Sequence, residues 1–183
     1  MTGHVVVLGG AVEGDVRADM LAALPRLRRF CEGLCRTAGD GDELMQATVE
    51  RALARSHQFV PGTRVDSWLF RIAQNMFIDD RRRDRRRGTH VPVDDMITLT
   101  GDDGRDVVEH RSELAMVYRA LDQLPADQRA AFLLVAVEGQ SYREAAEILD
   151  IPQGTVMSRL ARARARIATI LDAPDAISDS GVQ

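Results

Sequence analysis

Residues 139–167 read GQSYREAAEILDIPQGTVMSRLARARARI, and this stretch decides the fold. Ser141 followed by Glu144 forms the S-x-x-E pattern of a capping box, which predicts the start of a short helix. Four apolar or small residues then recur at helical spacing and form its expected buried stripe: Tyr142, Ala145, Ala146 and Leu149. Asp150 interrupts this spacing, and Pro152 is tolerated in the first turn of a following helix. The stretch therefore predicts two helices joined by a tight turn.

The second of these helices combines an apolar face with a basic face. The apolar face consists of Val156, Leu160, Ala163, Ile167 and Leu171. The other face consists of Thr155, Arg159, Arg162 and Arg166, and residues 155–171 contain four arginines and no acid. An uncompensated basic face, on a helix that follows a capped helix and a short turn, is typical of a helix that enters the DNA major groove. The alternative is a helical hairpin whose charged face is merely solvated.

Composition is compatible with nucleic-acid binding once the charges are placed along the chain. The 183 residues are enough for one medium domain or two small ones. The formal net charge is −4, and all 24 basic residues are arginine. The planar arginine fork grips phosphate and guanine edges, although codon bias explains the absence of lysine equally well.

The two cysteines and the N-terminus exclude several other classes of protein. Cys31 and Cys35 share one helix face with leucines, so we expect buried apolar cysteines rather than a disulfide framework or a metal or redox site. The short apolar run at residues 5–8 has no basic region before it, so it predicts neither a signal peptide nor a membrane span. We expect residues 1–19 to form a loose leader and the protein to be cytoplasmic.

Three helices are predicted in the N-terminal half. The first is expected from Met20 to Gly39, the second starts near Asp40 or Asp42, and the third is capped by Asp66 or Ser67. The third helix runs into residues 81–87, where six arginines stand against one aspartate. An aromatic and polar surface beside a basic track suits single-stranded nucleic acid, whereas such a charge run is otherwise a solvated helix end.

The middle of the chain changes character. Residues 88–111 are rich in glycine and aspartate, which predicts an acidic linker and explains the negative net charge. These aspartates lack the spacing of a calcium-binding loop. Helical spacing resumes at Ser112 and ends at Leu124-Pro125, and residues 128–138 form a nearly all-apolar helix. The prediction is an all-α fold of two small helical modules joined by a flexible acidic linker.

Three segments, taken in order, resemble the extracytoplasmic function (ECF) sigma factors, the small two-domain members of the sigma-70-type family of bacterial RNA polymerase. Residues 42–48, DELMQAT, are similar to sigma region 2.2. Residues 68–79, WLFRIAQNMFID, and the arginine run after them are similar to regions 2.3 and 2.4. Residues 142–164 are similar to region 4.2. The resemblance implies a leader at 1–19, region 2 at 20–88, a linker at 89–111, region 4 at 112–172 and a tail at 173–183.

The resemblance also implies which residues meet which partner. Core polymerase, through the clamp of its largest subunit, would be bound by Asp42, Glu43 and Gln46. The −10 promoter element would be bound by Trp68, Arg71, Asn75, Asp79, Arg82, Arg83, Arg85 and Arg86. The −35 element would be bound by Arg143, Thr155, Ser158, Arg159, Arg162 and Arg166. Asp150 stands where the family has a glycine, and aspartate can adopt the left-handed conformation that such a turn needs.

The function implied is that of a promoter-specificity subunit. It would bind core polymerase (clamp and flap) and promoter DNA in a stress or envelope response under an anti-sigma factor, without catalysis, cofactor, metal or membrane insertion. One alternative is a sigma-like adaptor that sequesters an anti-sigma factor without productive promoter binding. Another is a metal-dependent nuclease that uses the linker aspartates, but no paired carboxylate and histidine occur at ligand spacing.

Overall fold

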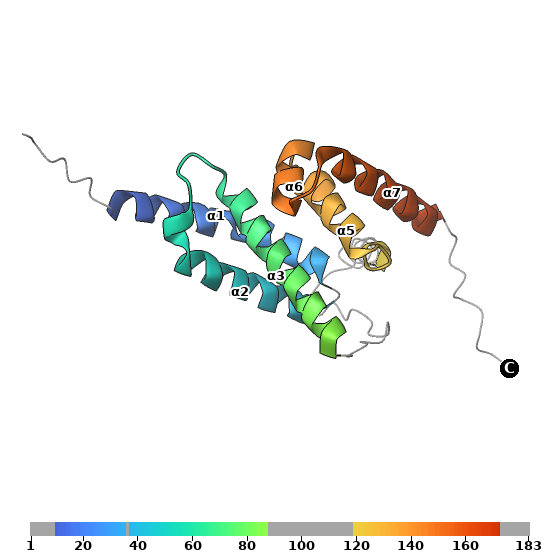
Figure 1. Cartoon of the computed structure of the whole chain (residues 1–183), viewed down its shortest axis with the longest axis horizontal. Helices are drawn as coiled ribbons and strands as arrows, with labels where there is room; N and C mark the ends of the chain where they lie inside the picture. Colours follow the sequence, from blue (N-terminus) through green and yellow to red (C-terminus); the bar gives the residue numbers. More distant parts are fainter. Residues whose placement is uncertain (1–9, 36, 88–118, 173–183) are drawn as a thin grey trace, which may run out of the picture.

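The computed structural model describes residues 10–35, 37–87 and 119–172, and all the regular structure in these ranges is helical (Figure 1). The elements in chain order are α1 (Gly10–Leu34), α2 (Ala38–Ala54), the 3-10 turn η1 (Ser56–Gln58), α3 (Val65–Arg87), α5 (Ala126–Phe132), the π-helical turn η2 (Leu133–Val137), α6 (Tyr142–Leu149) and α7 (Gln153–Asp172). Residues 119–122 are also helical. The predicted all-α fold of two helical modules is confirmed: α1–α3 form an N-terminal unit and α5–α7 form a C-terminal unit.

The N-terminal unit is a bundle in which α1, α2 and α3 pack on one another. Its core is apolar, and the rings of Phe30 and Phe70 meet with centroids 4.8 Å apart. The helices approach closely at Gly41, where an added Cβ would lie 2.8 Å from the backbone Cα of Glu32. Helix α2 begins after Thr37, whose hydroxyl accepts the Asp40 N–H at 3.1 Å and so caps the helix.

The start of α1 corrects the expectation of a loose leader over residues 1–19. The helix already begins at Gly10, whereas the leucine-rich spacing predicted a start at Met20. Val16 and Met20 are both buried, because the first turns of α1 continue along the bundle and contribute to its core. Residues 1–9 lie outside the described part of the chain.

The two cysteines are buried apolar groups, as predicted. Cys31 is fully buried and Cys35 is partly buried, and both are free thiols. Burial raises the pKa of Cys31 well above its usual range and, aided by the negative charge of Asp40, raises the pKa of Cys35 to about 12. Because the thiolate is the reactive form, these raised pKa values keep both side chains protonated at neutral pH and lower their reactivity.

The C-terminal unit departs from the single apolar helix predicted at residues 128–138. Helix α5 widens after Phe132 into the π-helical turn η2, where the Glu138 N–H donates to the Leu133 carbonyl at 2.9 Å. The predicted burial is confirmed at Ala130, Leu133 and Leu134, but it is wrong at Val137, which was expected on the same buried face and is 42 % exposed. The helix expected to open at Ser112 falls mostly outside the described residues, as do the acidic linker and the C-terminal tail.

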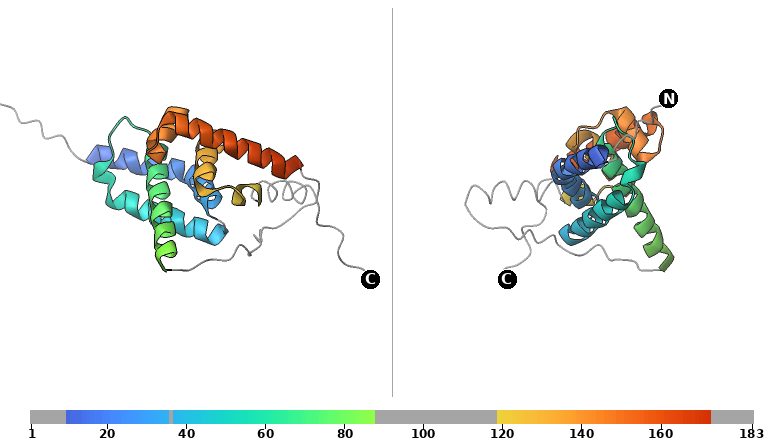
Figure 2. Two further views of the ribbon diagram at one scale, coloured as in Figure 1. Left: turned by 45° about the vertical axis from the view of Figure 1, so that its right-hand side comes forward. Right: turned by 90° about the vertical axis from the view of Figure 1, so that its left-hand side faces the viewer.

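The two units pack directly against each other. Helix α6 lies on α3, and α1 contacts both α5 and η2 (Figures 1 and 2). One apolar core cluster runs through both units. Helix α2 lies on the far side of the N-terminal unit from α6 and α7, and the arginine-rich end of α3 points away from them (Figure 2).

Candidate nucleic-acid interface

The predicted helix-turn-helix is present, and its first helix is fixed by the predicted capping box. The Ser141 hydroxyl accepts the Glu144 N–H at 3.2 Å, while the Glu144 carboxylate accepts the Ser141 N–H at 2.8 Å. These hydrogen bonds, with the charge of Arg64 nearby, hold the pKa of Glu144 below its usual value. Asp150 ends the helix with φ 52°, so the left-handed turn expected at this aspartate is confirmed.

Helix α7 turns its apolar face inward and exposes several of its polar side chains. Val156, Leu160 and Ala163 are buried against the rest of the C-terminal unit, as predicted. Leu171 was expected on the same face, but it is 46 % exposed because α7 extends past α5 and α6. The first turns of α7 follow the tight turn directly, which is the part of a recognition helix that enters a groove.

The six residues predicted to meet the −35 element are not equally presented. Arg162 and Arg166 are exposed on α7, and the Arg143 side chain on α6 is 82 % exposed. Thr155 and Ser158 are half-buried, and the Ser158 hydroxyl donates to the Thr155 carbonyl.

Arg159 differs from the other predicted −35 residues because its side chain pairs with a different helix, whereas Arg143 pairs with Glu147 within α6 at 3.8 Å. Its Nε lies 3.2 Å from the Asp127 carboxylate on α5, and its side chain is only 24 % exposed. The guanidinium is therefore held against α5, whereas Arg162 makes only hydrogen bonds within α7, to Ser158.

Sequence reasoning missed three further exposed side chains of α7. Gln153, Met157 and Arg164 face solvent, and Met157 is 50 % exposed. All three lie outside the buried stripe of Val156 and Leu160, so the helical phase alone was sufficient to find them. An exposed apolar side chain on a groove-reading helix can contact a thymine methyl group.

The residues predicted to meet the −10 element lie along α3. Trp68 is half-buried and packs on Phe59 with ring centroids 5.4 Å apart, while Asn75 and Asp79 are exposed. Arg71 is exposed but occupied, because its Nη2 donates to the Glu147 carbonyl of α6 at 2.6 Å.

Two arginines of the run at the end of α3 are exposed and pair with aspartates one turn earlier in the same helix. Arg82 lies 4.0 Å from Asp79 and Arg83 lies 2.7 Å from Asp80, and all four side chains are more than half exposed. Exposed ion pairs of this kind contribute about 1 kcal/mol or less, so phosphate can displace them. Arg86 is exposed as well, and the side chain of Arg85 lies outside the described part of the structure.

The residues predicted to bind polymerase share an open surface of α2. Asp42, Glu43 and Gln46 are all exposed. Asp42 pairs with Arg28 at 3.1 Å, and Gln46 donates to Glu50 at 3.4 Å. This surface remains free because the C-terminal unit packs on the other side of the bundle (Figure 2).

Comparison with known proteins connects these surfaces. Residues 20–74 match the family described as the sigma2 domain of PhyR, and residues 114–167 match the family described as sigma-70, region 4. The ECF RNA polymerase sigma factor EcfG of Rhodopseudomonas palustris is 39 % identical over 157 residues, which are 86 % of this chain and 85 % of that protein. The chain belongs to the ECF sigma factors. The ECF sigma factor SigM of Mycobacterium tuberculosis is 35 % identical over 80 % of this chain and 71 % of its own.

A solved sigma factor structure superposes on most of the chain, including both helical units. The sigma factor RpoE of Bartonella quintana, solved in complex with the anti-sigma factor NepR, superposes with a TM-score of 0.75 at 31 % identity. The match covers 87 % of this chain and 98 % of that chain. Within the described residues, no helix is long and apolar enough to cross a membrane. The same residues bring together no group of three or more histidine, cysteine or acidic side chains that could hold a metal ion.

Proposed function

We propose that this ECF sigma factor binds core RNA polymerase and directs transcription initiation at promoters with −10 and −35 elements. The observation that carries the proposal is the identity with EcfG, which spans 86 % of the chain and therefore includes both helical units. The exposed arginines of α7 and of the end of α3 supply the positive charge that two separate DNA contacts require.

Each unit has a separate task in this proposal. The acidic and amide side chains of α2 dock on the polymerase clamp. Helix α3 binds the strand released when the −10 duplex opens, because stacking and phosphate contacts offset the cost of unpairing. Helix α7 enters the major groove of the −35 element, and Arg143 on α6 reaches the phosphate backbone beside it.

The protein acts by positioning rather than by catalysis. The polymerase supplies the chemistry of RNA synthesis, so the sigma factor needs no cofactor, and it works in the cytoplasm where polymerase and DNA are. The similarity to RpoE solved with NepR supports control by an anti-sigma factor, as in a stress or envelope response.

A second candidate function rests on the match of residues 20–74 to the sigma2 domain of PhyR. In that alternative, the protein sequesters an anti-sigma factor and does not bind promoters productively. The match of residues 114–167 to sigma-70 region 4, with exposed Arg162, Arg164 and Arg166 in the corresponding helix, favours the promoter-specificity subunit. A decoy has no need of these charges.

Transcription reconstituted with core polymerase tests the proposal. We expect run-off products from a library of genomic fragments, and we expect Arg162→Ala with Arg166→Ala to abolish products that depend on the −35 element while core binding persists. The matched control is Arg17→Ala with Arg55→Ala, which removes the same charge from exposed sites of the N-terminal unit. No transcript from any fragment, with tight binding to an anti-sigma factor retained, would establish the decoy instead.

A further inference from the structure

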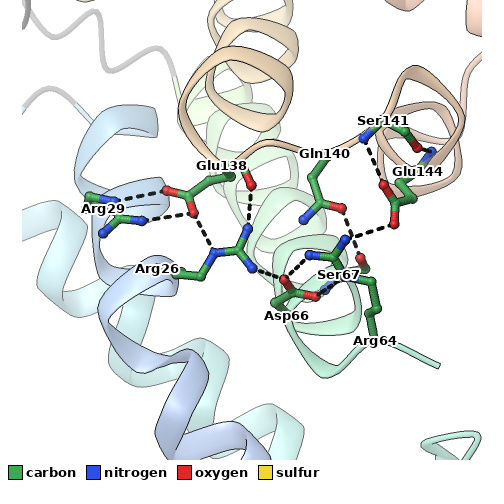
Figure 3. A network of polar contacts seen from close by, with 9 residues as sticks. All are labelled: Arg26, Arg29, Arg64, Asp66, Ser67, Glu138, Gln140, Ser141 and Glu144. Atoms are coloured by element: carbon green, nitrogen blue, oxygen red, sulfur yellow. Dashed lines mark hydrogen bonds and ion pairs between the residues drawn. The ribbon is translucent and has the colours of Figure 1, made fainter. Parts of the chain in front are cut away.

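A network of charged and polar side chains joins the two helical units (Figure 3). The N-terminal unit contributes Arg26 and Arg29 from α1, Arg64 just before α3, and Asp66 and Ser67 from its first turn. The C-terminal unit contributes Glu138, Gln140, Ser141 and Glu144, from the end of η2 to the first turns of α6. None of these residues belongs to the proposed polymerase or DNA surfaces, so the DNA-binding function leaves the network unexplained.

Glu138 is the centre of the network. Its side chain is completely buried, and its carboxylate lies 3.1 Å from Arg26 Nε and 3.3 Å from Arg29 Nε. Arg26 also donates to the backbone carbonyl of Glu138 and to the Asp66 carboxylate. A buried carboxylate without a cation is strongly disfavoured. Glu138 is therefore stable in this position only while α1 lies against it.

A second group of contacts lies beside Glu138. Arg64 reaches the Glu144 carboxylate at 3.0 Å, and the Ser67 hydroxyl donates to the side-chain oxygen of buried Gln140 at 3.2 Å. Arg71 donates to the Glu147 carbonyl at the other end of α6. The N-terminal half of α3 is thus covered by α6, and Arg71 of the proposed −10 surface is occupied by a backbone carbonyl.

This packed arrangement cannot place both units on one promoter. The names of the −10 and −35 elements give their positions, which differ by about 25 base pairs. At about 3.4 Å of helix axis per base pair, this separation is about 85 Å. Helices α3 and α6, by contrast, are in direct contact. The two units must separate before α3 and α7 can reach their elements.

We propose that Glu138, clamped by Arg26 and Arg29, is an autoinhibitory latch that holds the free sigma factor closed and covers the N-terminal half of α3, where Arg71 of the proposed −10 surface lies. This inference rests on the proposed function. The closed state leaves the α2 surface and the outer face of α7 accessible, so polymerase can dock before the units separate. Promoter engagement then competes with the latch, and the apparent affinity for the −10 strand is the affinity of the open form multiplied by its population.

The test compares Glu138→Gln with Glu32→Gln. Both changes remove one carboxylate, but the carboxylate of Glu32 pairs with Arg28 within α1 rather than with a residue of the other unit. Dyes are attached through Leu21→Cys and Ala168→Cys, which lie at exposed positions of the two units. Native Cys31 is buried and Cys35 is partly buried, so both should react more slowly than the exposed engineered thiols. Energy transfer reports the separation of the units without any DNA.

The expected result is a larger distance between dyes in Glu138→Gln than in the wild type, with Glu32→Gln unchanged. The affinity for a labelled mixed-sequence single strand of DNA should rise by about tenfold, because a charged hydrogen-bonded pair is lost from the closed state only. Arg26→Gln should act in the same direction, and it carries the test if Glu138→Gln loses its far-ultraviolet helical signal.

Equal dye distances and equal single-strand affinities in wild type, Glu138→Gln and Arg26→Gln would overturn the latch. Failure of the proposed function looks different, because the wild-type holoenzyme would then give no promoter-dependent transcript whatever the distance between the units. If the units separate in Glu138→Gln but the wild-type holoenzyme gives no transcript, the closed state would be established and its inhibitory role would be refuted.

Discussion

Replacing Arg82, Arg83 and Arg86 of α3 with alanine should flatten the salt dependence of single-strand binding. Each arginine that meets a phosphate contributes about 0.7 to the slope of log affinity against log salt concentration, so three lost contacts lower the slope by about 2. Between about 50 and 200 mM salt, the wild type should therefore lose about fifteenfold more affinity than the variant. The ion pairs of Arg82 with Asp79 and Arg83 with Asp80 are exposed, so stability should change by less than about 1 kcal/mol.

Fluorescence anisotropy of the full chain with a labelled mixed-sequence single strand measures this slope. The matched control replaces Arg17, Arg55 and Arg119, three exposed arginines that lie outside α3, and changes the net charge equally. It should keep the wild-type slope, because long-range attraction without phosphate contact releases few counterions. An unchanged slope in the α3 variant, or equal slopes in both variants, would show that the run is only a solvated helix end.

Three further changes test the packing and the capping of the two units. Gly41→Ala should destabilise the N-terminal unit, because its Cβ would approach the Glu32 backbone to 2.8 Å. Gly39→Ala in the same helix would make only an ordinary van der Waals contact, 3.9 Å from the Thr37 hydroxyl, and should not lower the melting temperature. Ser141→Ala should cost about 1 kcal/mol in thermal denaturation, and Ser141→Thr should recover most of it, since threonine also caps. The lowered pKa of Glu144 means that its contribution is complete above about pH 4.3 and is lost as the pH falls through the lowered value. Melting curves of wild type and Glu144→Gln should accordingly converge in acid, and a constant difference would contradict the assignment.

The helices and the turn of the C-terminal unit could be predicted because they depend on interactions between residues close in sequence. The capping box of Ser141 and Glu144, the left-handed turn at Asp150 and the apolar face of α7 depend on residues within a few positions of one another. Rules for capping and helical phase apply at that range. The start of α1 was missed for the opposite reason, because burial of Val16 against the bundle outweighs the weak helix propensity of the glycines near it.

The contacts that decide which side chains are available could not be predicted. Arg159 was predicted to meet the −35 element, yet it pairs with Asp127 of another helix. Glu138 and its partner Arg26 are separated by 112 positions, and a lone glutamate after an apolar run reads as a helix end. Periodicity predicts the helix face on which a residue lies, but it does not identify the side chains of another helix or unit that contact this residue.

The π-helical turn η2 affects the chemical character of the interface between the two units. In an α-helix the residue one turn beyond Leu133 is Val137, whereas the wider turn places Glu138 there instead. Val137 is consequently 42 % exposed and Glu138 is buried. One extra residue in the turn therefore replaces an aliphatic contact with an ionic one. Polar interfaces between domains separate more readily than hydrophobic interfaces. Deleting exposed Ala136 would keep Glu138 over Leu133 through an ordinary α-helical turn, so a chain one residue shorter could keep the same ionic contact without the π-helical turn.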